Sequence, residues 1–422
     1  MKFRVLFQKF AAFALVLTSF STVFAQRSQA PKQEKLLNGL KLLIWNDPAA
    51  DKVTIKIRIH SGAAFDPQGK EGVMLLIGES FFPNDAVRDF FKEDLGGGLW
   101  ITANYDYIQV TATARPDEFV TLLESVATAV SNPTIDRETT AKLKGKRLEK
   151  IAELRKDPAY LAQLAAAKQL FGTFPYGRAE LGTAESVSKI EFPDLLDAKQ
   201  RFLTADNATV SIAGKIDTAL AYRAARRYLG SWLKSDKMTP STFRQPDEPD
   251  TKMVKVTSEV DSDPYIGFAM RGLARNDKDY AASEVLTHIL ESRLKANVST
   301  SKSPVVFVDN SARFLPGDIE FGFTAAEGSE PPNNLVTLLL SKAIGNDEFT
   351  SAKAQANNTV LHTATDEKWL DVDTYKLTSA ADEQKAFESV TLADVQRVAE
   401  RLAKNPVVSV SVNKADKPAT AN

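Results

Sequence analysis

Alternating apolar and polar positions mark several short β-strands in this chain, among them 53–60, 208–214, 265–271 and 406–412. Strands that bury one face have this period of two, whereas helices that bury one face repeat apolar residues about every 3.6 positions. Helical periods follow the strands in runs, and they do not alternate regularly with single strands. The pattern therefore predicts an α+β fold, with mostly antiparallel sheets packed against helices.

The same order of elements occurs twice along the chain. A polar cap and an amphipathic helix over 188–202 lead into the strand 208–214, and a similar helix over 388–402 leads into the strand 406–412. The beginnings of the two halves agree less clearly, with a strand followed by a helix from Gly72 in one and from Asp279 in the other. We infer two homologous domains.

Residues 234–251 contain three prolines and many polar side chains without a helical or strand period, which indicates a linker. The expected domains are therefore residues 33–233 and residues 252–415.

Residues 1–25 resemble a cleavable signal peptide. Three basic residues precede an uncharged apolar stretch that ends in Val-Phe-Ala, so we expect the mature protein to begin at Gln26. Hydroxyl residues interrupt this stretch, which is shorter than the roughly 20 apolar residues of a membrane span. The chain has no cysteine, which excludes disulfides, thiolate metal sites and a lipid-modified cysteine. We expect a periplasmic or secreted protein without a stable membrane anchor, and a bacterial periplasm fits best.

The charge balance gives no sign of a polyanionic partner. The whole chain has 53 basic and 54 acidic residues, and removal of the signal leaves 50 against 54, a net charge of about −4. Binding to nucleic acid or to an anionic membrane is therefore not expected.

Few residues offer catalytic chemistry. The three histidines, His60, His288 and His362, are far apart in sequence, and we interpret His60 and His362 as structural or surface residues. His288 and Glu291 lie on one face of a predicted helix, but zinc needs three protein ligands. The glycines 96–98 lack the lysine of a phosphate-binding loop and predict a turn before a strand, and no Gly-x-Ser-x-Gly elbow is present.

Several motifs resemble the pitrilysin/insulinase zinc metallopeptidases (inverzincins), which include mitochondrial processing peptidase. They are Phe-Pro-Tyr-Gly-Arg at 174–178, Leu-Gly-Thr-Ala-Glu-Ser at 181–186, the strand ending Ile-Ala-Gly-Lys at 215, the opening Leu-Asn-Gly-Leu-Lys at 37–41, and Gly-Ala-Ala-Phe-Asp-Pro at 62–67. The resemblance covers roughly residues 33 to 415. It implies two homologous α+β domains that form half of a clam-shaped chamber.

The resemblance also implies a zinc site, and this chain departs from it. Active relatives carry His-x-x-Glu-His on the helix after the glycine that corresponds to Gly72, with two histidine ligands and a glutamate that activates water. Here Leu75 and Glu79 stand at the two ligand positions, and Gly78 stands at the position of the catalytic glutamate. One carboxylate cannot hold zinc by itself.

The third ligand of the family is a glutamate on a later helix, just before an isoleucine. By this alignment Lys150 replaces it, and Leu143 replaces an accompanying glutamate seven residues earlier. We therefore expect no catalytic residue, no bound metal and no cofactor in this chain. We also predict that Glu79 and Lys150 form an ion pair where zinc would lie, because a buried carboxylate needs a partner.

The substrate-binding groups of the second half are changed as well. Relatives follow Ser-Arg-Leu, which is 292–294 here, with an arginine and then a tyrosine that hold substrate, and the matching positions are Ser299 and Val306.

The resemblance implies an accessory role. Half-length members of this family pair, one subunit being catalytic and the other degenerate, so the leading hypothesis is a non-catalytic subunit that completes the peptide-degrading or processing chamber of a zinc-bearing homologue. A peptide-binding or scaffolding protein without a protease partner is the first alternative, and an enzyme with different chemistry on the same fold is the second.

Overall fold

A computed structural model describes residues 30–235, 243–260, 262–298, 300, 305–326, 332 and 334–414. The predicted signal peptide and the predicted new N-terminus at Gln26 lie outside the described residues. So does the middle of the predicted linker, residues 236–242.

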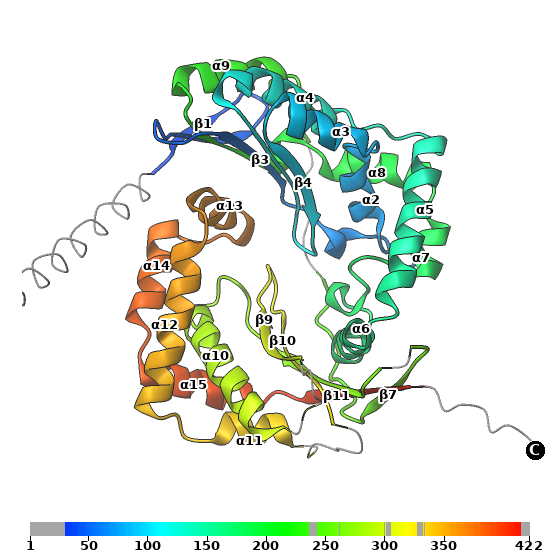
Figure 1. Cartoon of the computed structure of the whole chain (residues 1–422), viewed down its shortest axis with the longest axis vertical. Coiled ribbons are helices and arrows are strands. Elements are labelled where there is room, and N and C mark those ends of the chain that lie inside the picture. The colour runs from blue at the N-terminus through cyan, green and yellow to red at the C-terminus, as the bar shows by residue number, and fades with distance from the viewer. Residues whose placement is uncertain are drawn as a thin grey trace, which may run out of the picture.

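Two mixed sheets form the framework, and nearly all of their strand pairs are antiparallel (Figure 1). The first has the order β1(Lys32–Lys35), β2(Lys41–Asn46), β6(Ala208–Gly214), β3(Val53–Ile59), β5(Ile108–Ala114), β4(Gly98–Ala103). The second has the order β7(Val254–Ser258), β11(Val407–Lys414), β8(Tyr265–Arg271), β10(Asp318–Thr324), β9(Val306–Ser311). The parallel pairs are β2 with β6 and β7 with β11. The predicted α+β fold class is confirmed.

Helices follow the strands in both halves. The helices of the first half are α2(Val73–Ser80), α3(Ala86–Asp89), α4(Phe119–Ser131), α5(Arg137–Leu154), α6(Pro158–Phe171), α7(Ala184–Lys189), α8(Phe192–Phe202) and α9(Thr218–Leu229). Those of the second half are α10(Tyr280–Asn297), α11(Leu335–Ser341), α12(Asn346–His362), α13(Thr365–Tyr375), α14(Ala380–Ser389) and α15(Leu392–Leu402).

The duplication read from the sequence is confirmed by the topology. The strand order β2-β6-β3-β5-β4 is repeated as β7-β11-β8-β10-β9, with the parallel pair at the same place. The predicted helices 188–202 and 388–402 each prove to be two helices with a break. The second of each pair begins with a capping box, between Glu191 and Asp194 in α8 and between Thr391 and Asp394 in α15. Such boxes satisfy backbone amides at the new helix start, which fixes the break there.

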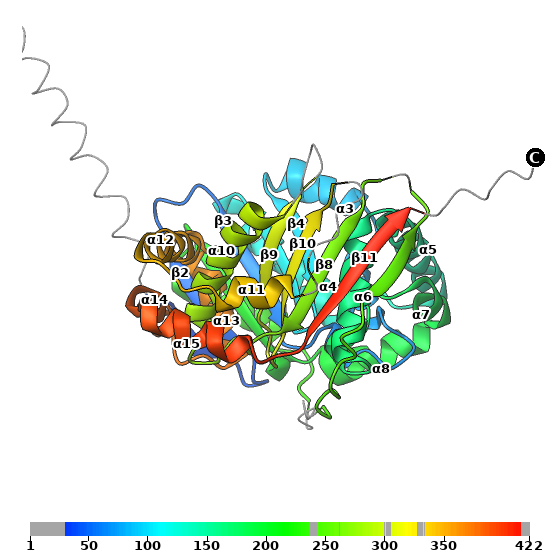
Figure 2. The same cartoon turned by 90° about the horizontal axis from the view of Figure 1, so that it is seen from below.

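The two halves exchange one helix each. Most helices cover the outer face of their own sheet, and large apolar clusters fill these two layers (Figure 1). However, α6 of the first half packs on the other face of the second sheet, along β8, β11 and β7 (Figure 2). Its equivalent in the second half, α13, packs on the first sheet at β6.

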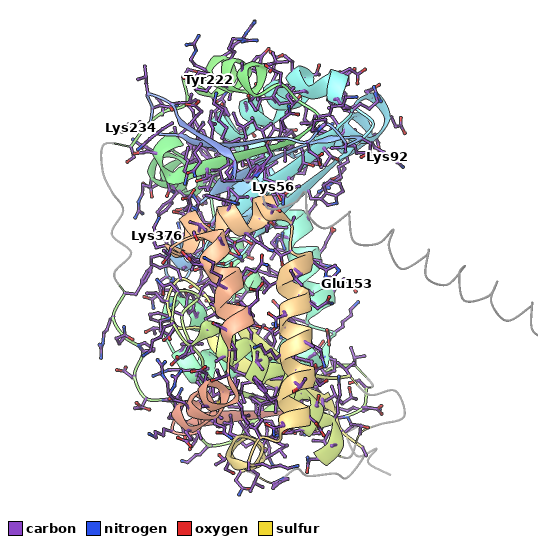
Figure 3. All side chains as sticks on the ribbon, turned by 90° about the vertical axis from the view of Figure 1, so that its left-hand side faces the viewer. Lys56, Lys92, Glu153, Tyr222, Lys234 and Lys376 are labelled. Carbon is purple, nitrogen blue, oxygen red and sulfur yellow. The ribbon has the colours of Figure 1, made fainter. Side chains whose placement is uncertain are left out.

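The two exchanged contacts differ in chemistry. Small and apolar side chains of α6, such as Ala162 and Ala166, pack with Ala269 and Val410 of the second sheet. The contact of α13 with the first sheet is ionic, and Figure 3 labels Lys56 at this junction, where the strands of the first sheet meet the helix.

Candidate functional site

Helix α2 holds the residues that correspond to the zinc motif. Gly72 caps its N-terminus with φ +107°, a conformation that glycine adopts without strain. The Asp66 carboxylate accepts hydrogen bonds from the backbone amides of Gly72 and Met74, at 2.7 and 2.8 Å. Burial raises the pKa of Asp66 to about 7, although these two amides oppose the shift. The start of α2 is thus fixed by a buried carboxyl group.

The three motif positions on α2 have different surroundings. Leu75 and Glu79 are half-buried, and their spacing of four residues places them on one side of the helix. Gly78 is buried against the sheet, where an added Cβ atom would lie 3.2 Å from the Ile108 side chain. A glutamate at this position would therefore have to displace a core side chain.

Helix α5 supplies the partner of Glu79, and it is Arg147. The Arg147 guanidinium donates a hydrogen bond from Nη2 to Oε1 of Glu79. The side chains are partly buried, with 10% exposure for Arg147 and 29% for Glu79. Leu143, Arg147 and Ile151 all face inward at intervals of four residues along α5.

The predicted ion pair between Glu79 and Lys150 is wrong. Lys150 is exposed to solvent, and the cation that meets Glu79 lies three residues earlier on the same helix. The alignment of α5 from sequence therefore slipped by three residues. The position of the accompanying glutamate, seven residues earlier, is then held by Thr140. The alignment from sequence had placed Leu143 there.

Two polar atoms of this pair, Oε2 of Glu79 and Nε of Arg147, are buried without a hydrogen-bond partner in the described structure, and so is Oγ1 of Thr140 two turns earlier on α5. Burial raises the pKa of Glu79, and the Arg147 charge acts in the opposite direction.

Zinc does not fit these residues. Leu75 cannot ligate a metal, and the guanidinium of Arg147, which offers only hydrogen-bond donors, occupies the space beside the one remaining carboxylate. Within the described ranges, no three histidine, cysteine or carboxylate side chains gather where they could hold a metal ion.

The three histidines serve other roles. His60 is enclosed, its ring nitrogens lie 3.1 Å from Oγ1 of Thr374 and 3.0 Å from Oγ1 of Thr209, and burial lowers its pKa to about 3. His288 is half-buried, and its predicted companion Glu291 binds Lys295 at 2.7 Å. His362 is exposed at the end of α12, which agrees with a surface role.

In the second half, the Ser-Arg-Leu segment read from the sequence lies on α10. Arg293 is buried and donates to Glu348 at 2.7 and 2.8 Å, so it ties α10 to α12. Val306 begins the edge strand β9, and Ser299 lies outside the described residues.

A buried ionic cluster at α13 was not apparent from the sequence. Arg58 of β3 is fully buried, and it donates to Asp371 at 2.6 Å and to Glu367. Lys56, two residues earlier, lies 3.0 Å from Asp366 and 2.7 Å from Glu367. These partners are more than 300 residues apart in sequence, so no local pattern could reveal them.

The glycines 96–98 form the expected turn before a strand. Gly96 has φ +65°, and a Cβ atom on Gly97 would lie 1.8 Å from the carbonyl oxygen of Thr113. The strand that follows, β4, is an edge of the first sheet and presents Trp100 with 53% of its surface exposed.

Comparison with protein families and curated proteins gives the following matches. Residues 189–336 match the family described as "Peptidase M16 inactive domain". A protein of Rickettsia bellii named "Uncharacterized zinc protease" is 23% identical over 208 residues, which is 48% of this chain and 50% of that protein. The Helicobacter pylori protein named "Non-peptidase homolog YmxG" is 30% identical over 106 residues, covering 25% of this chain and 24% of that protein. The match with the Rickettsia protein thus spans about half of that relative's length.

Solved structures share the fold over nearly the whole chain. A crystal structure of a peptidase M16 inactive domain from Pseudomonas fluorescens superimposes with a TM-score of 0.79 and 20% identity, covering 92% of this chain and 98% of that one. No helix among the described residues is long and apolar enough to span a membrane.

Proposed function

We propose that this chain, which belongs to the M16 family of pitrilysin-like peptidases, is a non-catalytic subunit that pairs with a zinc-bearing homologue and helps to enclose peptides. The match to an inactive M16 domain and the "non-peptidase" name of one relative support the non-catalytic part of this proposal.

The observation that carries the proposal is the ion pair between Glu79 and Arg147. In a zinc peptidase the metal would lie between α2 and α5, and in this chain a fixed cation on α5 neutralises the remaining carboxylate on α2. The charge of the metal is thus replaced by a charge of the protein. We infer that the fold has been kept while its metal chemistry has been given up.

The edge strand β4 supports a role in holding peptides. Its backbone groups on the side away from β5 have no strand partner in the described sheet. An extended peptide can add to such an edge through backbone hydrogen bonds, with little dependence on its sequence. The indole of Trp100 lies over Gly98, where a Cβ atom would come within 2.4 Å of the ring, and so adds an apolar surface beside this edge.

Pairing and location are the parts of the proposal that rest on the sequence and the family. A half-chamber would leave an inner surface open to water, which a second chain can close. The signal-like segment 1–25 supports export to the periplasm or the medium.

Co-expression tests the pairing. The chain, beginning at Gln26, is produced with a homologue from the same organism that carries intact His-x-x-Glu-His, and the pair is separated by size-exclusion chromatography. We expect a stable complex whose peptidase activity exceeds that of the homologue alone and is abolished when the catalytic glutamate of the homologue is changed to glutamine. If the homologue is equally active alone and no complex forms, the accessory role is refuted, and the alternative of a peptide-binding or scaffolding protein replaces it.

A further inference from the structure

A small cavity lies between α6 and the face of the second sheet that α6 covers. Its volume is about 180 Å³, below the 300 to 1,000 Å³ usual for drug-sized ligands and suited to a single side chain. Gly267 of β8 lines the cavity, and a Cβ atom there would lie 3.3 Å from the Ala162 side chain of α6.

Aromatic rings form the walls of this cavity. Tyr265 and Phe307 lie over Gly322, and a Cβ atom on that glycine would come within 2.0 Å of the tyrosine hydroxyl and 2.6 Å of the phenylalanine ring. Tyr160, half-buried on α6, lines the cavity as well. Glycine at position 322 therefore leaves room for these two rings, which pack over its backbone and, like Tyr160, line the cavity.

One buried carboxyl group closes the end of the cavity. Glu320 is 7% exposed, and its Oε2 accepts a hydrogen bond from Nε2 of Gln163 at 2.8 Å. The neighbouring cation, Arg313, is bound to Asp318 at 3.2 Å. Glu320 is thus hydrogen-bonded to an amide and to the Asp318 carboxyl group, which also holds the nearby guanidinium.

We propose that this cavity binds the basic side chain of a peptide, with its ammonium or guanidinium group between the aromatic rings and against the Glu320 carboxylate. Aromatic faces attract cations, and a carboxylate at the end of such a cage adds a charge-assisted hydrogen bond. An anion would meet the carboxyl groups of Asp157 and Glu320. A neutral side chain would gain no charge-assisted hydrogen bond to Glu320.

The protonation state of Glu320 is expected to depend on whether a cation occupies the cavity. Burial, together with the neighbouring Asp318, raises its pKa to about 8. The other charged groups near it are Asp309, opposite it on β9, Arg313, and Asp157, which lines the cavity from α6. Since the folded pKa lies above the ordinary value, the stability of the empty protein falls as the pH rises from the ordinary carboxyl pKa to about 8, because the unfolded chain loses this proton first. A bound cation favours the ionised form, so binding releases a proton and weakens in acid.

This inference rests on the peptide-holding role in the proposed function. Because the cavity lies within one chain, it can be tested without a partner. The probe is a capped alanine pentapeptide with lysine at its centre, compared with peptides that carry norleucine or arginine there. Isothermal titration calorimetry of the purified chain near pH 7, in buffers of different ionisation enthalpy, measures both affinity and proton release.

We expect the lysine and arginine peptides to bind at least about tenfold more tightly than the norleucine peptide, with release of about one proton. Glu320→Gln should abolish both the preference and the proton release. Phe307→Leu, which keeps an apolar wall but removes the π face, should weaken the lysine peptide by about two- to fivefold. Glu124→Gln, an exposed change on α4, serves as the matched control and should alter neither.

Equal binding of the lysine and norleucine peptides, or a preference that survives in the Glu320→Gln protein, would overturn the inference. Circular dichroism of each variant shows whether it is folded. Failure of the chain to form a complex with a zinc-bearing homologue would refute the pairing and would leave the result for the cavity unchanged.

Discussion

Removal of Arg147 is the most direct test of the ion pair that stands in place of the metal. Arg147→Met keeps an unbranched apolar stem but leaves the Glu79 carboxylate beside α5 without a counter-charge. Breaking a fully buried pair costs about 3 to 5 kcal/mol. Because 29% of the Glu79 side chain is exposed, water recovers part of this loss, and we expect about 2 kcal/mol.

The double variant Glu79→Leu/Arg147→Met should be close to the wild type, within about 1 kcal/mol, because no charge is then left unpaired. The coupling energy between the two positions is therefore predicted to be favourable and larger than that of a surface pair. Lys150→Met is the matched control on the same helix, and because Lys150 is exposed it should change stability by less than about 0.5 kcal/mol.

Urea unfolding, followed by circular dichroism and by tryptophan fluorescence, gives these free energies if the two probes coincide. The reasoning is refuted if Lys150→Met destabilises the protein as much as Arg147→Met does. It is also refuted if the double variant loses the sum of the two single losses, since Glu79 and Arg147 would then act independently.

Two further predictions concern the junctions of α2 and α13. The triple variant Leu75→His/Glu79→His/Arg147→Glu should create a site that retains zinc through gel filtration. The triple variant Leu75→His/Glu79→His/Lys150→Glu should not retain zinc, and elemental analysis of the two eluted proteins tests this difference. Arg58→Met should cost about 3 kcal/mol and expose α13 to limited proteolysis, because it removes the fully buried cation that joins Glu367 and Asp371, which then keep only Lys56 and Arg275 as partners. An unchanged digestion pattern would show that the remaining contacts hold this helix without Arg58.

Periodicity was enough to predict the strands and the duplicated order of elements. The strand over 208–214 has the predicted bounds, and the helix predicted from Asp279 begins one residue later, at Tyr280. These features depend on the alternation of buried and exposed side chains along the chain, which is local. The breaks inside the helices 188–202 and 388–402 were missed because the polar caps were placed three residues too early.

Periodicity alone could not predict which basic residue of α5 pairs with Glu79. A shift of three residues along a helix turns a side chain by only about 60° and moves it about 4.5 Å, so 147 and 150 lie on neighbouring parts of one surface. A signal was nevertheless present, since Arg147 stands four residues from both Leu143 and Ile151, in the middle of the apolar stripe. A charged residue in such a stripe needs a buried partner, and Lys150 lies outside it.

The ionic contact of α13 with the first sheet depends on tertiary structure alone. Basic residues at 56 and 58 in a strand that is otherwise apolar were visible, but their partners come from the other half of the chain. The same holds for the cavity beside Glu320, whose walls come from α6 and from three strands of the second sheet.

The exchange of α6 and α13 has a consequence for how the chain folds. Each sheet receives one of its covering helices from a segment far away in sequence, so neither half can bury both faces of its sheet until the other half is in place. Contacts of such long range are costly in loop entropy and form late. The two halves are therefore expected to acquire their final stability together, in one cooperative step, and a chain emerging from a ribosome or a translocation channel would hold the first sheet incompletely covered until residues 365–375 had followed.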